Sequence, residues 1–330
     1  MEQQQQQQQE EIQERQQEQQ HQQKEEKQEK PQQEEEQQQW PRWALDWIYN
    51  IDQDAVSEDW VVDPDKVALV LSLKDDMGNS LLQQAVIYGD DTFVGFLLQK
   101  APALLDVEPG HSTPLHQAAG NGFWRIVQTF LSAGASPSSL DKEGQSPLHM
   151  ACHQGWLGCS RLLLEASTAE LDLQDWCGCT PLHLALNGGY LELVELLVEK
   201  ATLSTLALKD KAGMTVLHQA ARLGHVGTVE KLLNKAGSVD LVEVTCKGGE
   251  TPLHQAAKWG RCSVVEFLVE KASVRANVNA VSDSGETPLM LASESMLCVS
   301  EAAAMETLRV LERACGARPT TVLTTASCAA

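Results

Sequence analysis

The chain has 330 residues, 42% of them hydrophobic, and its 46 acidic against 25 basic residues give a formal net charge of −21. This charge disfavours non-specific binding to nucleic acid, which requires Lys and Arg against the phosphates, and disfavours docking on an anionic membrane. The start of the chain shows no signal sequence, no apolar run approaches the roughly 20 residues that span a bilayer, and nine scattered cysteines are typical of reduced thiols. These features predict an intracellular protein without membrane insertion, in the cytoplasm, with the nucleus as the alternative.

Residues 1–39 form a low-complexity leader with twenty Gln and eleven Glu. Such a composition buries too little apolar surface to offset the entropy of ordering, so we predict a disordered leader. A coiled coil is disfavoured because Ile12 is the only aliphatic residue in the leader and provides no apolar seam.

The composition changes at Trp40, where three tryptophans follow at helical spacing. Trp40, Trp43 and Trp47 share one face of a helix. We predict that residues 40–73 form a helical N-terminal cap, with a partner-binding role for the same tryptophans as the alternative.

From residue 74 onward the chain repeats one pattern. Its signature begins at Ser80, Thr113, Ser146, Thr180, Thr215, Thr251 and Thr287, at intervals of 33 to 36 residues, and reads TPLHQAA at both Thr113 and Thr251. Thr or Ser suits a helix N-cap and Pro suits the next position. Glycines two residues before and nine residues after most of these positions indicate turns, and an apolar segment follows. Residues 74–314 are thus predicted to hold seven repeats of turn, short helix, turn and longer helix. The seventh should place its second helix about seven residues late, near Thr307 to Leu311.

The repeated pattern resembles the ankyrin repeat family, whose signature reads Asp-x-x-Gly-x-Thr-Pro-Leu-His-x-Ala. The resemblance implies an all-α ankyrin-repeat solenoid of helix-turn-helix repeats with β-turn fingers, followed by a flexible tail over residues 315–330. It also implies that the signature histidines bond to backbone rather than perform chemistry. These are His116, His149, His183, His218 and His254.

Catalytic and metal-binding motifs are weak in this sequence. Cys177 and Cys179 with His183 are the best metal candidates, yet structural zinc sites favour cysteines separated by two or more residues. We find no nucleophile elbow, Walker loop or dinucleotide fingerprint. The prediction is a protein without enzymatic activity or cofactor, with a metal-dependent activity at Cys177 and Cys179 as a minor alternative.

The resemblance also implies a partner-binding concave face built from the finger tips and the ends of the first helices. In the third to sixth repeats these positions hold five Lys or Arg against two acidic residues, together with two tryptophans. We therefore predict a monomeric protein-interaction scaffold or adaptor that binds an acidic and hydrophobic segment of another protein. A targeting or inhibitory subunit of an enzyme complex is the alternative, and solvated positions without a shared partner are the simplest reading. The predicted contact residues are Tyr88, Lys142, His153, Trp176, Lys211, Met214, Arg222, Leu223, Lys247, Lys258 and Trp259.

Overall fold

The computed structural model describes residues 78–100, 105, 112–237, 241–271, 276–294 and 300–315. The chain forms two compact parts, Met1–Tyr88 and Gly89–Ala330, and each is described by itself. The leader predicted for 1–39, the cap predicted for 40–73 with its three tryptophans, and residues 316–330 of the predicted tail lie outside the described residues.

The described residues of the first part contain one helix, α4, over Leu81–Tyr88. The first repeat has Gln83 where the second to sixth signatures have His, and the Gln83 side chain helps to cap the start of the helix. Its side-chain oxygen accepts a hydrogen bond from the Ser80 backbone N–H at 2.8 Å, while the Ser80 hydroxyl accepts from the Gln83 N–H at 3.3 Å. The pair therefore closes the start of α4 as a capping box does.

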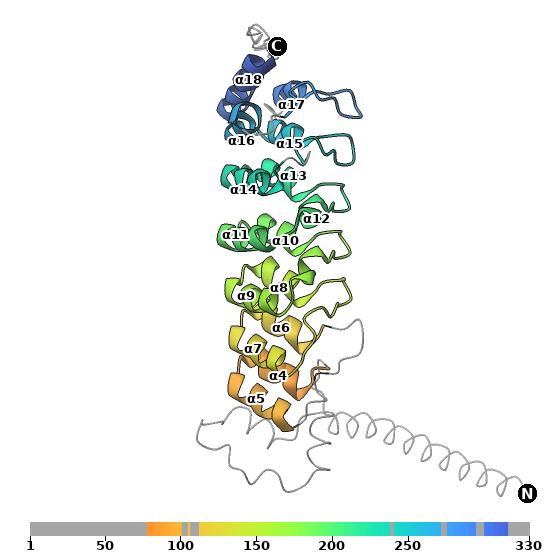
Figure 1. The fold of residues 1–330 in the computed structure, drawn as a ribbon, viewed down its shortest axis with the longest axis vertical. Coiled ribbons are helices and arrows are strands. Elements are labelled where there is room, and N and C mark those ends of the chain that lie inside the picture. The colour runs from red at the N-terminus through yellow and green to blue at the C-terminus, as the bar shows by residue number, and fades with distance from the viewer. Residues whose placement is uncertain are drawn as a thin grey trace, which may run out of the picture. The chain divides into compact units, whose positions relative to one another are not determined.

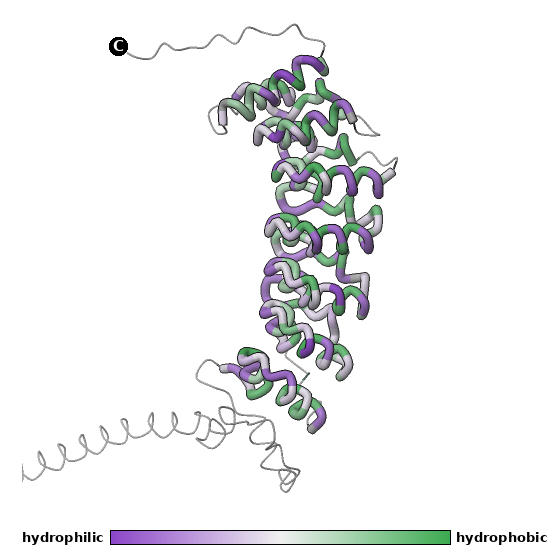
Figure 2. Tube along the Cα trace, turned by 90° about the vertical axis from the view of Figure 1, so that its left-hand side faces the viewer, coloured by the Kyte–Doolittle hydropathy of each residue, from purple (hydrophilic) through white to green (hydrophobic). Residues whose placement is uncertain are grey.

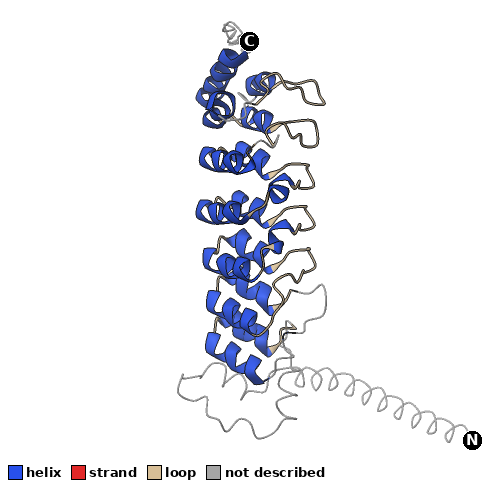
Figure 3. Cartoon of the chain, in the orientation of Figure 1, coloured by secondary structure: helices blue, strands red, loops and turns tan. Residues whose placement is uncertain are grey.

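All elements described in the second part are helices joined by loops and turns (Figure 3). The second helix of the first repeat is α5 (Asp91–Lys100). The following helix pairs are α6 (Pro114–Asn121) with α7 (Trp124–Ser132), α8 (Pro147–Gln154) with α9 (Leu157–Ala166), α10 (Pro181–Asn187) with α11 (Leu191–Lys200), α13 (Val216–Leu223) with α14 (Val226–Ala236), α15 (Pro252–Lys258) with α16 (Cys262–Glu266), and α17 (Pro288–Glu294) with α18 (Glu301–Cys315). The all-α prediction is confirmed.

The first helices begin and end where the signature predicts. The Thr113 hydroxyl accepts from the His116 N–H, and Pro114 occupies the first turn, where its missing N–H is harmless. The helix ends at Gly122, whose φ of 81° is left-handed, a conformation that costs a residue with a Cβ about 1–2 kcal/mol. The same start recurs at Ser146, Thr180 and Thr251.

Within this part, first helices pack on first helices and second helices on second helices (Figure 1). The signature leucines Leu115, Leu148, Leu182, Leu217 and Leu253 are buried in this stack, and small residues such as Ala118 and Ala151 allow the helices to approach closely. Hydrophobic and hydrophilic residues alternate along each helix (Figure 2). Each repeat thus buries its apolar face against its neighbour.

Elements appear between repeats that the sequence pattern does not predict. A 3₁₀ turn, η3, covers Ala169–Asp172, and a short helix, α12, covers Leu203–Ala207. In the sixth repeat α16 continues as a π-helix, η4, over Phe267–Lys271.

The expectation for the seventh repeat is wrong in its spacing. Its second helix, α18, begins 14 residues after Thr287, against 11 residues in the six preceding repeats, so the delay of the helix start is three residues rather than seven. The helix also runs for 15 residues. The extra length places Ala304, Thr307, Leu308 and Leu311 in buried positions of the last layer.

Candidate protein-binding surface

The five signature histidines tie each repeat to the next. In each, Nδ1 accepts the backbone N–H of the preceding Thr or Ser, for example 3.1 Å from Thr113 N to His116. Nδ1 is therefore unprotonated, so Nε2 carries the proton and donates to a carbonyl of the following repeat. The accepting carbonyls are those of Gln145, Cys179, Met214, Glu250 and Glu286, at 3.0 to 3.3 Å.

Burial lowers the pKa of all five histidines, that of His218 to about 4. Only the neutral imidazole fits these hydrogen bonds, because an additional proton on Nδ1 would point at the N–H of the Thr or Ser. Both ring nitrogens are committed to hydrogen bonds, as the resemblance implies, and no ring nitrogen of the five is free to act as a ligand or base.

The loop before each first helix from α8 onward closes into a tight finger. We define the fingers as residues 141–145, 175–179, 210–214, 246–250 and 282–286. In each, the first N–H donates to the carbonyl of the fifth residue at 2.9 to 3.0 Å. The Asp175 carboxylate also accepts the N–H groups of Cys177 and Cys179, both at 2.8 Å. The carbonyl of the fifth finger residue also accepts the hydrogen bond from the signature histidine of the preceding repeat. Each finger is therefore bonded to the first helix of the repeat before it.

Successive fingers are also bonded to each other. The N–H of the second finger residue donates to a carbonyl of the preceding finger, from Trp176 to Glu143 at 2.9 Å and from Lys211 to Cys177 at 2.8 Å. The bonds from Lys247 to Ala212 and from Asp283 to Gly248 are both 2.9 Å. The fingers project beside the first helices, away from the second helices (Figure 1). We call Lys142, Trp176, Lys211 and Lys247, which occupy the second position of four successive fingers, the fingertip row.

The structure exposes most of the predicted contact residues. All four residues of the fingertip row are exposed, Trp176 to 64%, and so are His153, Lys258 and Trp259. Met214, Arg222 and Leu223 are half-buried. Tyr88 is exposed and belongs to the first compact part, which is described by itself.

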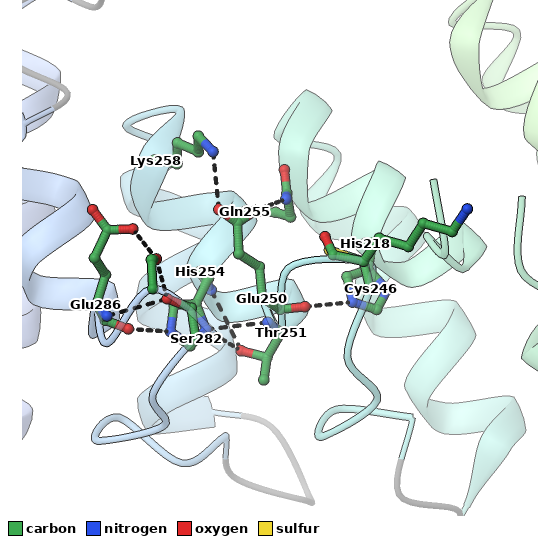
Figure 4. A network of polar contacts seen from close by, with 11 residues as sticks. His218, Cys246, Glu250, Thr251, His254, Gln255, Lys258, Ser282 and Glu286 are labelled. Carbon is green, nitrogen blue, oxygen red and sulfur yellow. Dashed lines mark hydrogen bonds and ion pairs between the residues drawn. The ribbon is translucent and has the colours of Figure 1, made fainter. Parts of the chain in front are cut away.

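Lys258 is not available as a free positive charge. Its ammonium lies 2.9 Å from the Glu250 carboxylate, which also accepts a hydrogen bond from the Gln255 side chain (Figure 4). The carbonyl of the same Glu250 accepts the bond from His218. Lys258 therefore serves the sixth repeat itself, and the basic character of the surface rests on the fingertip lysines.

Arg222 is also constrained. Its carbonyl accepts the Arg261 Nε at 2.9 Å, and its own Nε is buried without a hydrogen-bond partner among the described residues. Its side chain is therefore held among neighbours near the end of α13.

The minor metal alternative finds little support in the geometry. Both nitrogens of His183 are bonded to backbone groups, Thr180 N and Met214 O. Burial and the nearby Asp175 raise the pKa of the Cys179 thiol to about 12, which disfavours the thiolate that a metal would need. Among the described residues, no group of three His, Cys, Asp or Glu is placed to hold a metal ion.

Two further exposed tryptophans lie at the starts of second helices, outside the family's binding register: Trp124 is the first residue of α7, and Trp156 directly precedes α9. Trp124 is 49% exposed, and the Arg125 guanidinium lies 5.4 Å from its ring centroid. Trp156 is 43% exposed and donates to the Gly120 carbonyl at 2.7 Å. Trp156 therefore has a structural role between repeats, and Trp124 is a useful control for experiments on the other face.

Layers of helix pairs with a hydrogen-bonded row of fingers define a repeat scaffold, a class of protein that offers an extended surface to other proteins. A family model for ankyrin repeats, in three copies, matches residues 115–207, 203–280 and 242–307, which together span more than half of the chain. The chain belongs to the ankyrin repeat family. None of the described helices is long and apolar enough to cross a membrane.

Several known proteins are similar to this chain. Human B-cell lymphoma 3 protein is 32% identical over 133 residues, covering 38% of this chain and 29% of that protein. Human NF-kappa-B inhibitor alpha is 31% identical over 130 residues, covering 37% of this chain and 41% of that protein. The matches thus span less than half of these relatives. The crystal structure of the ankyrin repeat domain of Bcl-3, described as a unique member of the IkappaB protein family, superposes with a TM-score of 0.58 at 29% identity, covering 70% of this chain and 99% of the other.

Proposed function

We propose that this protein is a non-enzymatic, intracellular interaction scaffold, monomeric by itself, that binds a partner protein along the fingers and first helices of the third to sixth repeats. The observation that carries the proposal is the exposure of Trp176 and Trp259 on this surface. Exposed aromatic residues on a fixed framework are frequent anchors of protein interfaces.

The two tryptophans differ in how firmly the framework holds them. A Cβ on Gly144 would lie 2.8 Å from Cδ1 of Trp176, so the Trp176 indole rests on the preceding finger. Trp259 follows the last residue of α15, and its N–H donates to Gln255 O at 3.2 Å. Trp259 is the less exposed of the two, at 42% against 64%, so truncating either tryptophan should cost a little stability.

Replacing both tryptophans by Ala should weaken partner binding at least about tenfold, because interface tryptophans commonly contribute 2 kcal/mol or more. The measurement is quantitative capture of the partner by the full-length chain, followed by titration calorimetry with the purified partner. Trp124→Ala removes a tryptophan of similar exposure from a second helix and should leave binding unchanged. Loss of binding in Trp124→Ala as well, or none in the double variant, would place the interface elsewhere.

A second candidate function is inhibition of the bound partner. It corresponds to the alternative predicted from the sequence, a targeting or inhibitory subunit of an enzyme complex. It is supported by the similarity to NF-kappa-B inhibitor alpha. The direct test is titration of the purified full-length chain with NF-kappa-B, with the double tryptophan variant in parallel. Binding that depends on the tryptophans favours this candidate, and absence of binding leaves the general scaffold with a different partner.

A further inference from the structure

The fingertip row is held at fixed spacing by backbone hydrogen bonds. The N–H groups of Trp176, Lys211 and Lys247 each donate to the preceding finger at 2.8 to 2.9 Å. Because the main chain sets these positions, the backbone needs little reordering when a ligand binds, and a preorganised backbone loses less entropy on binding.

One member of the row is an apolar anchor. Trp176 is the most exposed of the large hydrophobic residues described, at 64%, and its indole lies against Gly144. A ring that is both exposed and fixed gains from being covered by an apolar side chain of a partner.

The two lysines that follow this anchor in the row carry no ion pair within the described part of the chain, although the exposed Glu143 precedes the anchor and Asp283 holds the same position in the fifth finger. Lys211 and Lys247 are exposed and make no ion pair among the described residues, whereas Lys231 pairs with Glu195 on the second helices. The finger carboxylate nearest in sequence, Asp210, accepts the N–H of Met214 at 2.8 Å and serves its own turn. In a chain of net charge −21, these two lysines give the row a local preference for acidic groups.

The spacing of the row matches an extended peptide. The fingers precede first helices that pack on one another, and packed helices lie about 8–10 Å apart. The same finger position should therefore recur about every 10 Å, which is close to three residues of extended chain at about 3.3 Å each.

We propose that the fingertip row docks an extended acidic segment of the partner protein, with an apolar residue on Trp176 and acidic residues three and six positions away on Lys211 and Lys247. This inference rests on the proposed scaffold function and adds the chemistry of the ligand. Either chain direction satisfies the spacing, so the test includes both.

The probes are two fluorescent peptides with Gly and Ser at the remaining positions. One carries Leu followed by Glu at the third and sixth positions beyond it, and the other has the reverse order. Fluorescence anisotropy with the full-length chain should show binding of at least one peptide, weakening as salt is added. K211E/K247E should reduce its affinity at least about tenfold, and a peptide with Lys in place of Glu should bind that variant better than it binds the wild type.

The matched control is R161E/K200E, which makes the same charge change at exposed residues of α9 and α11. It should leave peptide binding unchanged, with far-ultraviolet dichroism confirming that both variants are folded. The inference is overturned if neither peptide binds, or if both double variants weaken binding equally. If the captured partner requires Trp176 and Trp259 but tolerates K211E/K247E, the scaffold function stands and the acidic ligand does not.

Discussion

Gly213→Ala should destabilise the protein by about 2–3 kcal/mol, although the substitution adds only one methyl group. Gly213 has a φ of 78°, so a Cβ there costs about 1–2 kcal/mol in backbone strain. The added Cβ would also lie 2.7 Å from the backbone nitrogen of Lys247, on the next finger. The finger must then move and weaken the bond from Lys247 to Ala212, worth about 1 kcal/mol.

The chain supplies a matched control in its last finger. Gly285 occupies the same finger position with a φ of 85°, but a Cβ there would meet nothing within 4 Å, since no described finger follows. Gly285→Ala should therefore cost only the strain, about 1–2 kcal/mol. Urea unfolding followed by far-ultraviolet dichroism compares the two, and equal losses would mean that the contact between fingers adds nothing to stability.

Most of the fold was predictable because the signature repeats in register and each copy constrains the others. Thr or Ser, Pro, and the two glycines mark the start and end of a first helix, and the structure confirms these limits at Thr113 and Gly122. The linker helix α12 was missed because its cap, Thr202, pairs with Thr205 instead of the Glu or Gln of a capping box. The change from α to π in the sixth repeat leaves no sequence signal at all.

The surface was less predictable than the fold, because side-chain partners depend on three-dimensional distance. The family register finds the exposed positions, such as Trp176 and Lys211. It does not reveal that Lys258 pairs with Glu250, eight residues earlier, and so lacks a free charge. Nor does it reveal that each signature histidine reaches a carbonyl about 30 residues ahead, in the next repeat.

The stability of the protein should be greatest near pH 7, as far as its buried ionisable groups decide it. Glu170, on η3, is fully buried, and neither carboxylate oxygen has a hydrogen-bond partner among the described residues. Burial raises its pKa from 4.5 to about 8, so the neutral acid is the form that the fold prefers. The stabilisation that the neutral Glu170 side chain contributes below pH 4.5 is therefore lost progressively as the pH rises toward 8.

The five signature histidines act in the opposite direction. Their pKa values in the folded state lie below 6.5, that of His218 at about 4. Their contribution to stability is therefore complete well above pH 6.5 and is lost as the pH falls toward these folded-state pKa values. Below pH 6.5 the five histidines outweigh the one glutamate, and well above it only Glu170 still titrates among these groups. The two effects cancel near pH 7, which places the maximum there.

Glu170→Gln separates the two effects because the amide resembles the protonated acid in shape and carries no charge. At pH 7 the variant should be more stable than the wild type by about 3.5 kcal/mol, from about 2.5 pH units at about 1.4 kcal/mol each. At pH 5 the difference should shrink to below about 1 kcal/mol, because the wild-type carboxyl is then protonated in the fold and only partly ionised in the unfolded chain.

Urea unfolding of both proteins between pH 4.5 and 8.5 tests this prediction. Glu165→Gln, at an exposed position of α9, is the control and should follow the wild-type curve. Both the wild type and Glu170→Gln should lose stability below pH 6.5, since the histidine bonds between repeats are the same in each. A variant that is no more stable than the wild type at pH 7 would mean that the Glu170 carboxylate is solvated or paired in the folded protein.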